Sequence, residues 1–117
     1  MIAGHVRSVD ASWWIDSVMQ TQSLWERTRG LLGKEALGVD QALWIFPCNS
    51  VHSIGMSYAL DLVYLNKQLE VVKLVSGLQP LRASMAFGAH SVLELRTGEL
   101  ARLGIQVGDQ LKWWPNE

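Results

Sequence analysis

The chain has 117 residues, of which 49% are hydrophobic and 18% charged, and its formal net charge is −1. This composition excludes a disordered chain and predicts a single domain that can bury a core without a metal or a disulfide. The ten lysine and arginine residues are scattered and form no basic stripe, so we expect no nucleic-acid partner.

The cellular setting follows from three sequence features. The single cysteine, Cys48, excludes an intrachain disulfide and indicates a reducing compartment. Residues 1–14 lack the continuous apolar core of a signal peptide. The charge-free stretch from Gln41 to Leu60 contains a proline, an asparagine, a histidine and several serines, which hydrocarbon does not tolerate. We therefore expect a soluble, cytoplasmic protein without a membrane partner, and no pattern indicates its oligomeric state.

The N-terminal segment, residues 1–11, is weakly patterned, and we expect it to be a loose lead-in to a single domain that spans residues 1–117. The next segment, Trp13 to Met19, alternates between apolar and polar residues, although imperfectly. This alternation predicts the first strand.

A helix is predicted after this strand. Ser23 and Glu26 have the spacing of a capping box, in which each side chain satisfies the other residue's backbone amide. We expect the helix to run from about Leu24 to Leu31. It carries Arg27 and Arg29, whose guanidinium groups are free to reach a neighbouring element.

The middle of the chain reads as a series of strands and turns. One strand is apolar on both faces, which indicates a central position, and Pro47 then starts a turn because proline cannot extend an interior strand. A hairpin is predicted across Asn66-Lys67. The strands predicted here are Gln41 to Phe46, Val51 to Ile54, Tyr58 to Leu65 and Leu69 to Val75.

The C-terminal part begins with Gln79 to Ala89, which has no clear period and is predicted to be an irregular loop. Thr97 is expected to cap a second short helix that ends at Gly104. Strands are predicted at Ser91 to Arg96 and at Gln110 to Trp114. Together these elements predict a mainly β domain: a compact, barrel- or sandwich-like antiparallel sheet with two short helices.

Asp61 is the strongest anomaly, because it lies in a strand that is otherwise apolar on both faces. An unpaired buried carboxylate is costly, so Asp61 needs a cationic partner or a polar cleft. The candidate partners are Arg27, Arg29, Arg82 and His52. We expect an ion pair that docks the first helix on this strand, with Arg27 as the partner and Arg82 next in line. A functional carboxylate in a cleft is the alternative.

Glu94 poses the same question within its strand. Exposure on an edge strand is one explanation, and pairing with Arg82 is the other. Cys48 and His52 are candidates for a nucleophile and its base, but an extended chain separates their Cα atoms by roughly 13 Å. No residue spacing fits a metal site, and no phosphate loop is present, so no cofactor is expected.

Several segments of this chain, taken in order, match the pattern of one known family. The matching segments are Glu26 to Leu32, Pro47 to Met56, Leu60 to Leu65, Pro80 to Arg82, Val92 to Leu95, Gly98 and Leu103 to Asp109. Over roughly Gln22 to Leu111 the chain resembles a prokaryotic family called domain of unknown function family 192. The resemblance implies a compact, mainly β fold and supplies no settled activity. It marks Arg27, Gly30, Met56, Asp61, Glu94, Gly98, Gly104, Gly108 and Asp109 as family positions.

Two functional hypotheses remain open. The leading one is a non-enzymatic binding module with a cleft around Asp61 and His52 that takes a small molecule or a peptide. Its candidate ligand-binding residues are Arg27, Trp44, His52, Met56, Asp61, Arg82 and Glu94. The alternative is a hydrolase or transferase with Cys48 as nucleophile, His52 as base and Asp61 as orienting group, and the sequence does not decide whether any catalysis occurs.

Overall fold

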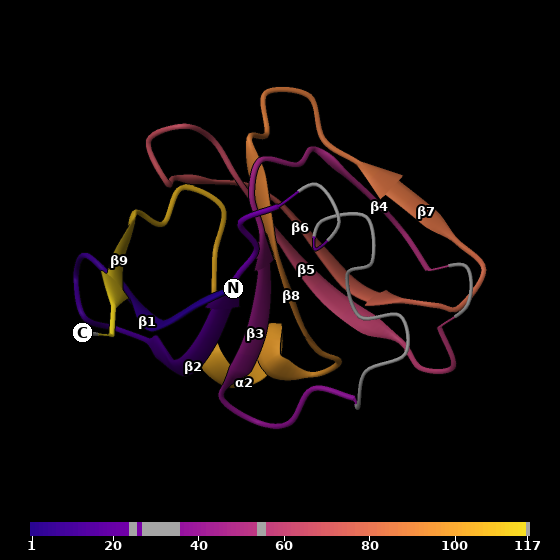
Figure 1. Ribbon diagram of the computed structural model, residues 1–117, viewed down its shortest axis with the longest axis horizontal. Coiled ribbons are helices and arrows are strands. Elements are labelled where there is room, and N and C mark those ends of the chain that lie inside the picture. The colour runs from indigo at the N-terminus through magenta and orange to yellow at the C-terminus, as the bar shows by residue number, and fades with distance from the viewer. Residues whose placement is uncertain (24–25, 27–35, 54–55, 117) are drawn as a thin grey trace.

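A curled β-sheet forms the body of the structure, a computed structural model that describes residues 1–23, 26, 36–53 and 56–116 (Figure 1). Its seven strands are β1 (Ile2–Ser8), β2 (Trp14–Gln20), β3 (Gln41–Ile45), β5 (Leu60–Leu65), β6 (Val71–Leu78), β8 (Ser91–Arg96) and β9 (Leu111–Pro115). They are hydrogen-bonded in the order β6-β5-β8-β3-β2-β1-β9. Two further strands, β4 (Ser50–His52) and β7 (Ala83–Met85), form a separate pair. The prediction of a mainly β fold is confirmed.

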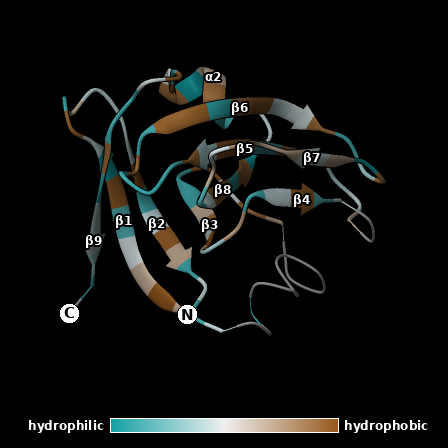
Figure 2. Ribbon diagram, turned by 90° about the horizontal axis from the view of Figure 1, so that it is seen from above, coloured by the Kyte–Doolittle hydropathy of each residue, from teal (hydrophilic) through white to brown (hydrophobic). Residues whose placement is uncertain are grey.

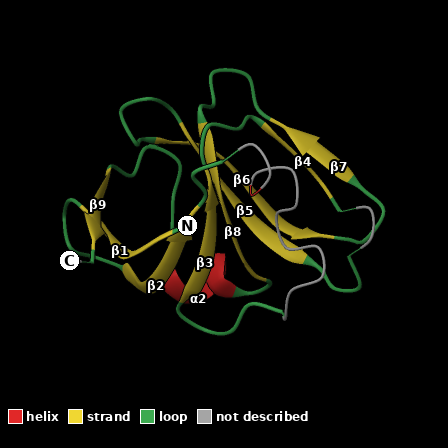
Figure 3. Ribbon diagram, viewed as in Figure 1, coloured by secondary structure: helices red, strands yellow, loops and turns green. Residues whose placement is uncertain are grey.

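The sheet curls into a half-barrel, and its two edge strands meet at one end (Figure 3). There the amide of Leu111 donates to the carbonyl of Leu69 at 2.9 Å, and the amide of Val71 donates to the carbonyl of Asp109 at 2.8 Å. One neighbouring pair, β2 and β3, runs parallel, which corrects the expectation of a fully antiparallel sheet. The long connection between these two strands permits the parallel pairing, which a short hairpin would not.

Two hydrophobic cores lie on opposite faces of the sheet. The inner core, which includes Trp44 and Leu93, lies inside the curl. The outer core, which includes Leu62 and Val92, lies on the other face together with Val51 from β4. Because both faces are covered, β5 is buried along its whole length, and β3 is buried at all but its first residue. This burial confirms the central position predicted for the strand that begins at Gln41.

The N-terminal segment is not the loose lead-in that we expected, because Ile2–Ser8 forms β1 between β2 and β9. The buried positions of this strand are Gly4, Val6 and Ser8. Because two of them hold a small or a polar residue, the sequence does not show the apolar–polar alternation of a strand. Gly4 is required by packing: a Cβ there would lie 2.5 Å from the Trp113 side chain. Pairing on both sides therefore fixes a segment whose own sequence pattern is weak.

A β-bulge explains the imperfect alternation of β2. Val6 pairs with Ile15 and Gly4 pairs with Val18, so one residue, His5, faces two residues on β2. Those two residues are Asp16 and Ser17, and Ile15 and Val18 on either side are both buried. The extra residue shifts the alternation by one position, as bulges do.

The described residues contain one short helix, α2 (Glu99–Leu103), rather than the two that we expected. It ends as predicted at Gly104, which has a φ of 72°. The other helix, predicted from about Leu24 to Leu31, falls outside the described residues apart from Glu26. No helix in the described part of the chain is long and apolar enough to span a membrane.

The capping box at the start of the predicted first helix is seen in part. The amide of Glu26 donates to Ser23 Oγ at 3.1 Å, as predicted. The Glu26 carboxylate accepts from the amide of Gln22 at 2.7 Å, one residue before the expected donor, and from the amino group of Met1 at 2.8 Å. The second half of the box is thus shifted by one residue.

The hairpin between β5 and β6 is confirmed, but its loop is longer than two residues. Asn66 Oδ1 accepts from the amides of Gln68 and Glu70, at 3.0 and 2.9 Å. This side-chain turn delays β6, which begins at Val71 rather than at Leu69.

The segment predicted to be an irregular loop, Gln79 to Ala89, contains the strand β7. It pairs antiparallel with β4, with Val51 opposite Ser84. Strands of three residues are too short to produce a visible alternation, so long-range pairing decides their structure.

Candidate functional site

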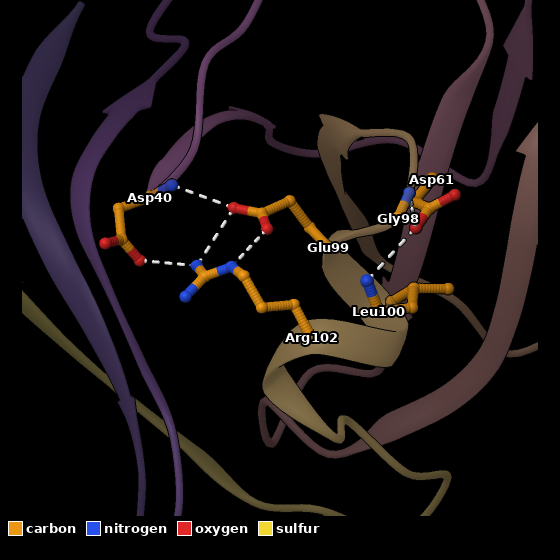
Figure 4. A network of polar contacts seen from close by, with 6 residues as sticks. All are labelled: Asp40, Asp61, Gly98, Glu99, Leu100 and Arg102. Atoms are coloured by element: carbon orange, nitrogen blue, oxygen red, sulfur yellow. Dashed lines mark hydrogen bonds and ion pairs between the residues drawn. The ribbon is translucent and has the colours of Figure 1, made fainter.

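Asp61 on β5 is fully buried, and backbone amides satisfy its carboxylate. Oδ1 accepts from the amide of Gly77 at 2.8 Å. Oδ2 accepts from the amides of Gly98 and Leu100, both at 3.0 Å (Figure 4). Gly98, with a φ of 94°, is the N-cap of α2 and has no side-chain cap of its own. Asp61 therefore caps α2, the role that we had expected Thr97 to play.

This arrangement bears on the expected ion pair of Asp61. Arg27, its proposed partner, lies outside the described residues, so that pair stays a prediction. The three amides already provide the favourable hydrogen bonds that a buried carboxylate requires. We had considered a cation or a polar cleft, and neither is needed to account for the burial of Asp61.

A second polar network ties α2 to the turn before β3 (Figure 4). Arg102 donates to the carboxylate of Glu99 and, at 2.7 Å, to Asp40 Oδ1, while the amide of Asp40 donates to Glu99 Oε1 at 2.8 Å. The hydrogen bond from Arg102 holds the pKa of Glu99 below its usual range. Sequence reasoning missed this network, although the spacing of Glu99 and Arg102 is that of a helical ion pair.

Glu94 on β8 is a further buried carboxylate, and one of its two oxygens lacks such partners among the described residues. It lies between Leu43 on β3 and Leu62 on β5, and it is 4% exposed. No group in the described part of the chain donates a hydrogen bond to its Oε1 atom. Burial raises the pKa of Glu94 to about 7. The strand β8 is interior, so exposure on an edge strand was the wrong explanation.

Three buried hydroxyl groups, those of Tyr58, Tyr64 on β5 and Ser84 on β7, likewise form no well-aligned hydrogen bond within the described part of the chain. Burial raises the pKa of Tyr58, and the charge of Glu94 raises it further. Burial likewise raises the pKa of Tyr64, against the lowering effect of a weak side-chain hydrogen bond with Ser84, and Cys48 and Glu94 add to the rise. These couplings place the four groups near one another, and we call Tyr58, Tyr64, Ser84 and Glu94 the polar cluster.

The other predicted ligand-binding residues are divided among different parts of the fold. Trp44 lies in the inner core, on the same face of the sheet as Asp61. Its ring centroid is 5.2 Å from that of Trp113. Met56 packs against the outer core, on the side of Glu94. His52 is exposed on β4. Asp61 and His52 thus lie on different sides of the sheet, and a ligand site is better sought on the side of Glu94.

Arg82 lies directly before β7 and forms no ion pair with Glu94 in the described structure. Its amide donates to Ser53 Oγ at 2.8 Å, which fixes the backbone of the loop. A hollow of about 340 Å³ is formed by the six residues of β4 and β7, including His52 and Ser84. Ser84 therefore belongs both to this hollow and to the polar cluster.

The candidate catalytic residues Cys48 and His52 line different hollows. Cys48 shares a hollow of about 250 Å³ with His90, and its amide donates to the carbonyl of His90 at 2.7 Å. The Cys48 thiol donates to the carbonyl of Ser50 at 2.9 Å. Donation to a carbonyl favours the protonated thiol over the nucleophilic thiolate. Among the described residues, no three histidine, cysteine, aspartate or glutamate side chains lie close enough together to hold a metal ion.

Comparison with solved structures shows the same fold in two bacterial proteins. The first is a protein of unknown function from Novosphingobium aromaticivorans, with a TM-score of 0.82, 22% identity, and coverage of 95% of this chain and 85% of that chain. The second is a candidate transcription regulator from Sinorhizobium meliloti, with a TM-score of 0.83, 21% identity, and coverage of 95% and 93%. At such identities the likeness is one of fold.

Comparison with protein families gives a match over most of the chain. A search of curated proteins gives no match to this chain. The model of domain of unknown function family 192, described as "Uncharacterized ACR", matches residues 9–113. This confirms the resemblance found in the sequence, and the chain belongs to that family.

Proposed function

We propose that the protein is a non-enzymatic binding module that takes a small organic cation at the polar cluster. The observation that carries this proposal is the buried Glu94 carboxylate, whose Oε1 atom has no hydrogen-bond partner among the described residues and lies near three buried hydroxyl groups. Buried polar groups in native proteins are nearly always hydrogen-bonded. Each one left unpaired costs roughly 1–3 kcal/mol, so several poorly satisfied groups in one place favour a ligand that pairs with them.

The chemistry of the cluster favours a cation over other ligands. An ammonium or guanidinium group brings several N–H donors and a positive charge, which is what a desolvated carboxylate lacks. The hydroxyl groups of Tyr58 and Tyr64 can accept further N–H bonds, and aromatic rings attract cations. An anion would meet the charge of Glu94 instead. The ligand is therefore a small amine or the basic side chain of a peptide.

The catalytic alternative is second to this proposal. Its single support is that Cys48 shares a hollow with His90, which would replace His52 as the base. The hydrogen bond from the Cys48 thiol to Ser50 weighs against a reactive thiolate. We infer a cytoplasmic location from the single cysteine of the sequence, which can form no intrachain disulfide, together with the absence of a long apolar helix in the described residues.

Thermal-shift titration with matched ligands tests the binding proposal. Butylamine, putrescine and agmatine are the cationic probes, and butanol and butyrate are neutral and anionic probes of similar size. We expect the cations alone to stabilise the protein, because a ligand that binds only the folded state raises stability by mass action. Glu94→Gln keeps the shape of the side chain and should weaken cation binding at least about tenfold.

The matched control is Glu70→Gln, which removes an exposed carboxylate from the loop before β6. It should leave cation binding unchanged. Stabilisation by butyrate equal to that by butylamine would contradict the proposal. Equal cation affinity in the Glu94→Gln variant and the natural sequence would contradict it as well.

A further inference from the structure

The outer face of β9, β1 and β2 gathers exposed aromatic and charged side chains. These strands lie side by side, on the opposite side of the molecule from β4 and β7 (Figure 2). Trp14 is 52% exposed and Trp114 is 44% exposed. Indole rings bury a large area when they pack, so two exposed on one face favour contact with a ligand.

Cross-strand pairing places basic groups next to these rings. Arg7 on β1 pairs with Trp14 on β2 and with Lys112 on β9, which makes a row across the three strands. The next row pairs His5 with Trp114, whose rings stack at 6.1 Å between centroids. Directly opposed side chains in a sheet have Cβ atoms about 5 Å apart. One ligand can therefore touch members of both rows.

A hollow of about 360 Å³ lies on this face, lined by His5, Arg7, Ala11, Trp14 and Asp16. This volume is within the roughly 300–1,000 Å³ of small-molecule sites. The bulge in β2 places Asp16 opposite His5. Bulges often re-aim a side chain in this way beside binding sites.

The polar groups of the hollow are available to a ligand. Within the described part of the chain, the Arg7 guanidinium and the Asp16 carboxylate form neither a hydrogen bond nor an ion pair with another residue. The hollow thus presents an unpaired guanidinium, an unpaired carboxylate and a flat indole surface. These match an anion, a hydrogen-bond donor and a planar ring, respectively.

We propose that this hollow binds a nucleoside monophosphate whose base carries an exocyclic amino group. The base stacks on Trp14, as nucleobases do on aromatic side chains. The amino group donates to the Asp16 carboxylate, and the phosphate accepts two hydrogen bonds from Arg7, with Lys112 adding a second positive charge. An aliphatic anion would leave Trp14 uncovered, and a cation would be repelled by Arg7. This site is separate from the polar cluster and does not depend on it.

Calorimetric titration with four related ligands tests the inference. Adenosine monophosphate carries all three features, inosine monophosphate lacks the amino group, adenosine lacks the phosphate, and inorganic phosphate lacks the base. We expect adenosine monophosphate to bind at least about tenfold more tightly than each of the others. Arg7→Gln should reduce its affinity to that of adenosine, and Asp16→Asn should remove its advantage over inosine monophosphate.

Matched controls are Arg96→Gln and Phe87→Ala, which change an exposed cation and an exposed aromatic ring on other strands and loops. Neither should alter nucleotide affinity, whereas Trp14→Phe should keep binding and Trp14→Ala should lose it. Equal binding of the adenosine and inosine nucleotides would overturn the inference. So would an equal effect of Arg7→Gln and Arg96→Gln, or binding of a short oligoadenylate when adenosine monophosphate does not bind.

Discussion

At the scale of the residue, Glu94 carries an energetic cost that depends on pH. The unfolded chain exposes this side chain to water, where its pKa is near 4.5, whereas burial raises the pKa to about 7 in the folded protein. Between these values the folded state holds a proton that the unfolded state has released. Stability must therefore fall as the pH rises through this window.

We predict that the free energy of unfolding decreases by about 3 kcal/mol between pH 4.5 and about pH 7.5, from the shift at Glu94 alone. The Glu94→Gln variant has no carboxyl group to titrate at this position, so its free energy of unfolding should not show this decrease with pH. Urea unfolding of both proteins at several pH values measures the difference. A constant gap between the two proteins across this range would show that Glu94 titrates normally.

The sequence identified Glu94 as unusual but could not show that its Oε1 atom lacks a hydrogen-bond partner in the described part of the chain. A single charge in an apolar strand is visible in the sequence, whereas the groups around it come from β5, β7 and the segment before β5. Tyr58, Tyr64 and Ser84 carried no signal of their own, since tyrosine and serine are common in strands and loops. Only the assembled fold brings their hydroxyl groups to one carboxylate.

At the scale of the element, α2 depends on a side chain that is distant in sequence. This five-residue helix is too short to be stable alone, and its first amides donate to Asp61 on β5. Asp61 also accepts from Gly77, whose φ of 67° is a conformation that glycine favours. One carboxylate thus joins three elements of the fold.

We predict that Asp61→Asn destabilises the protein by about 3 kcal/mol, because it removes the charge from three buried hydrogen bonds and points an amide group at N–H donors. Thr97→Ala is the matched control at the position where the sequence had suggested a cap, and it should change stability by less than about 0.5 kcal/mol. The midpoints of urea unfolding report both values. A larger loss of stability for Thr97→Ala than for Asp61→Asn would show that Thr97, and not Asp61, caps α2.

The elements that were predicted well are those with strong local patterns. The strand β8 lies at its predicted bounds, Ser91 to Arg96, and α2 ends at the predicted Gly104. The elements that were missed, β1 and β7, are held by pairing with distant strands. β1 fills its inward positions with Gly4 and Ser8, which no hydrophobic pattern reveals.

At the scale of the whole molecule, the curled sheet separates two kinds of surface. One face, with β4 and β7 over it, holds the polar cluster, and the outer face of β9, β1 and β2 holds exposed tryptophans and basic residues. The sequence predicted the general architecture from its alternating strands. It could not predict which candidate residues share a face, because Trp44 and Glu94 lie on adjacent strands but on opposite faces.

The most direct test of the cation-binding site is the pKa of Glu94, measured by NMR from the chemical shift of its carboxyl carbon. We predict a pKa near 7 in the free protein. Saturating putrescine should lower it by at least about one unit, because a bound cation favours the charged carboxylate. The same titration with butanol should leave it unchanged. A pKa of Glu94 near its ordinary value, or one that putrescine does not lower, would contradict the assignment of the polar cluster as a cation-binding site.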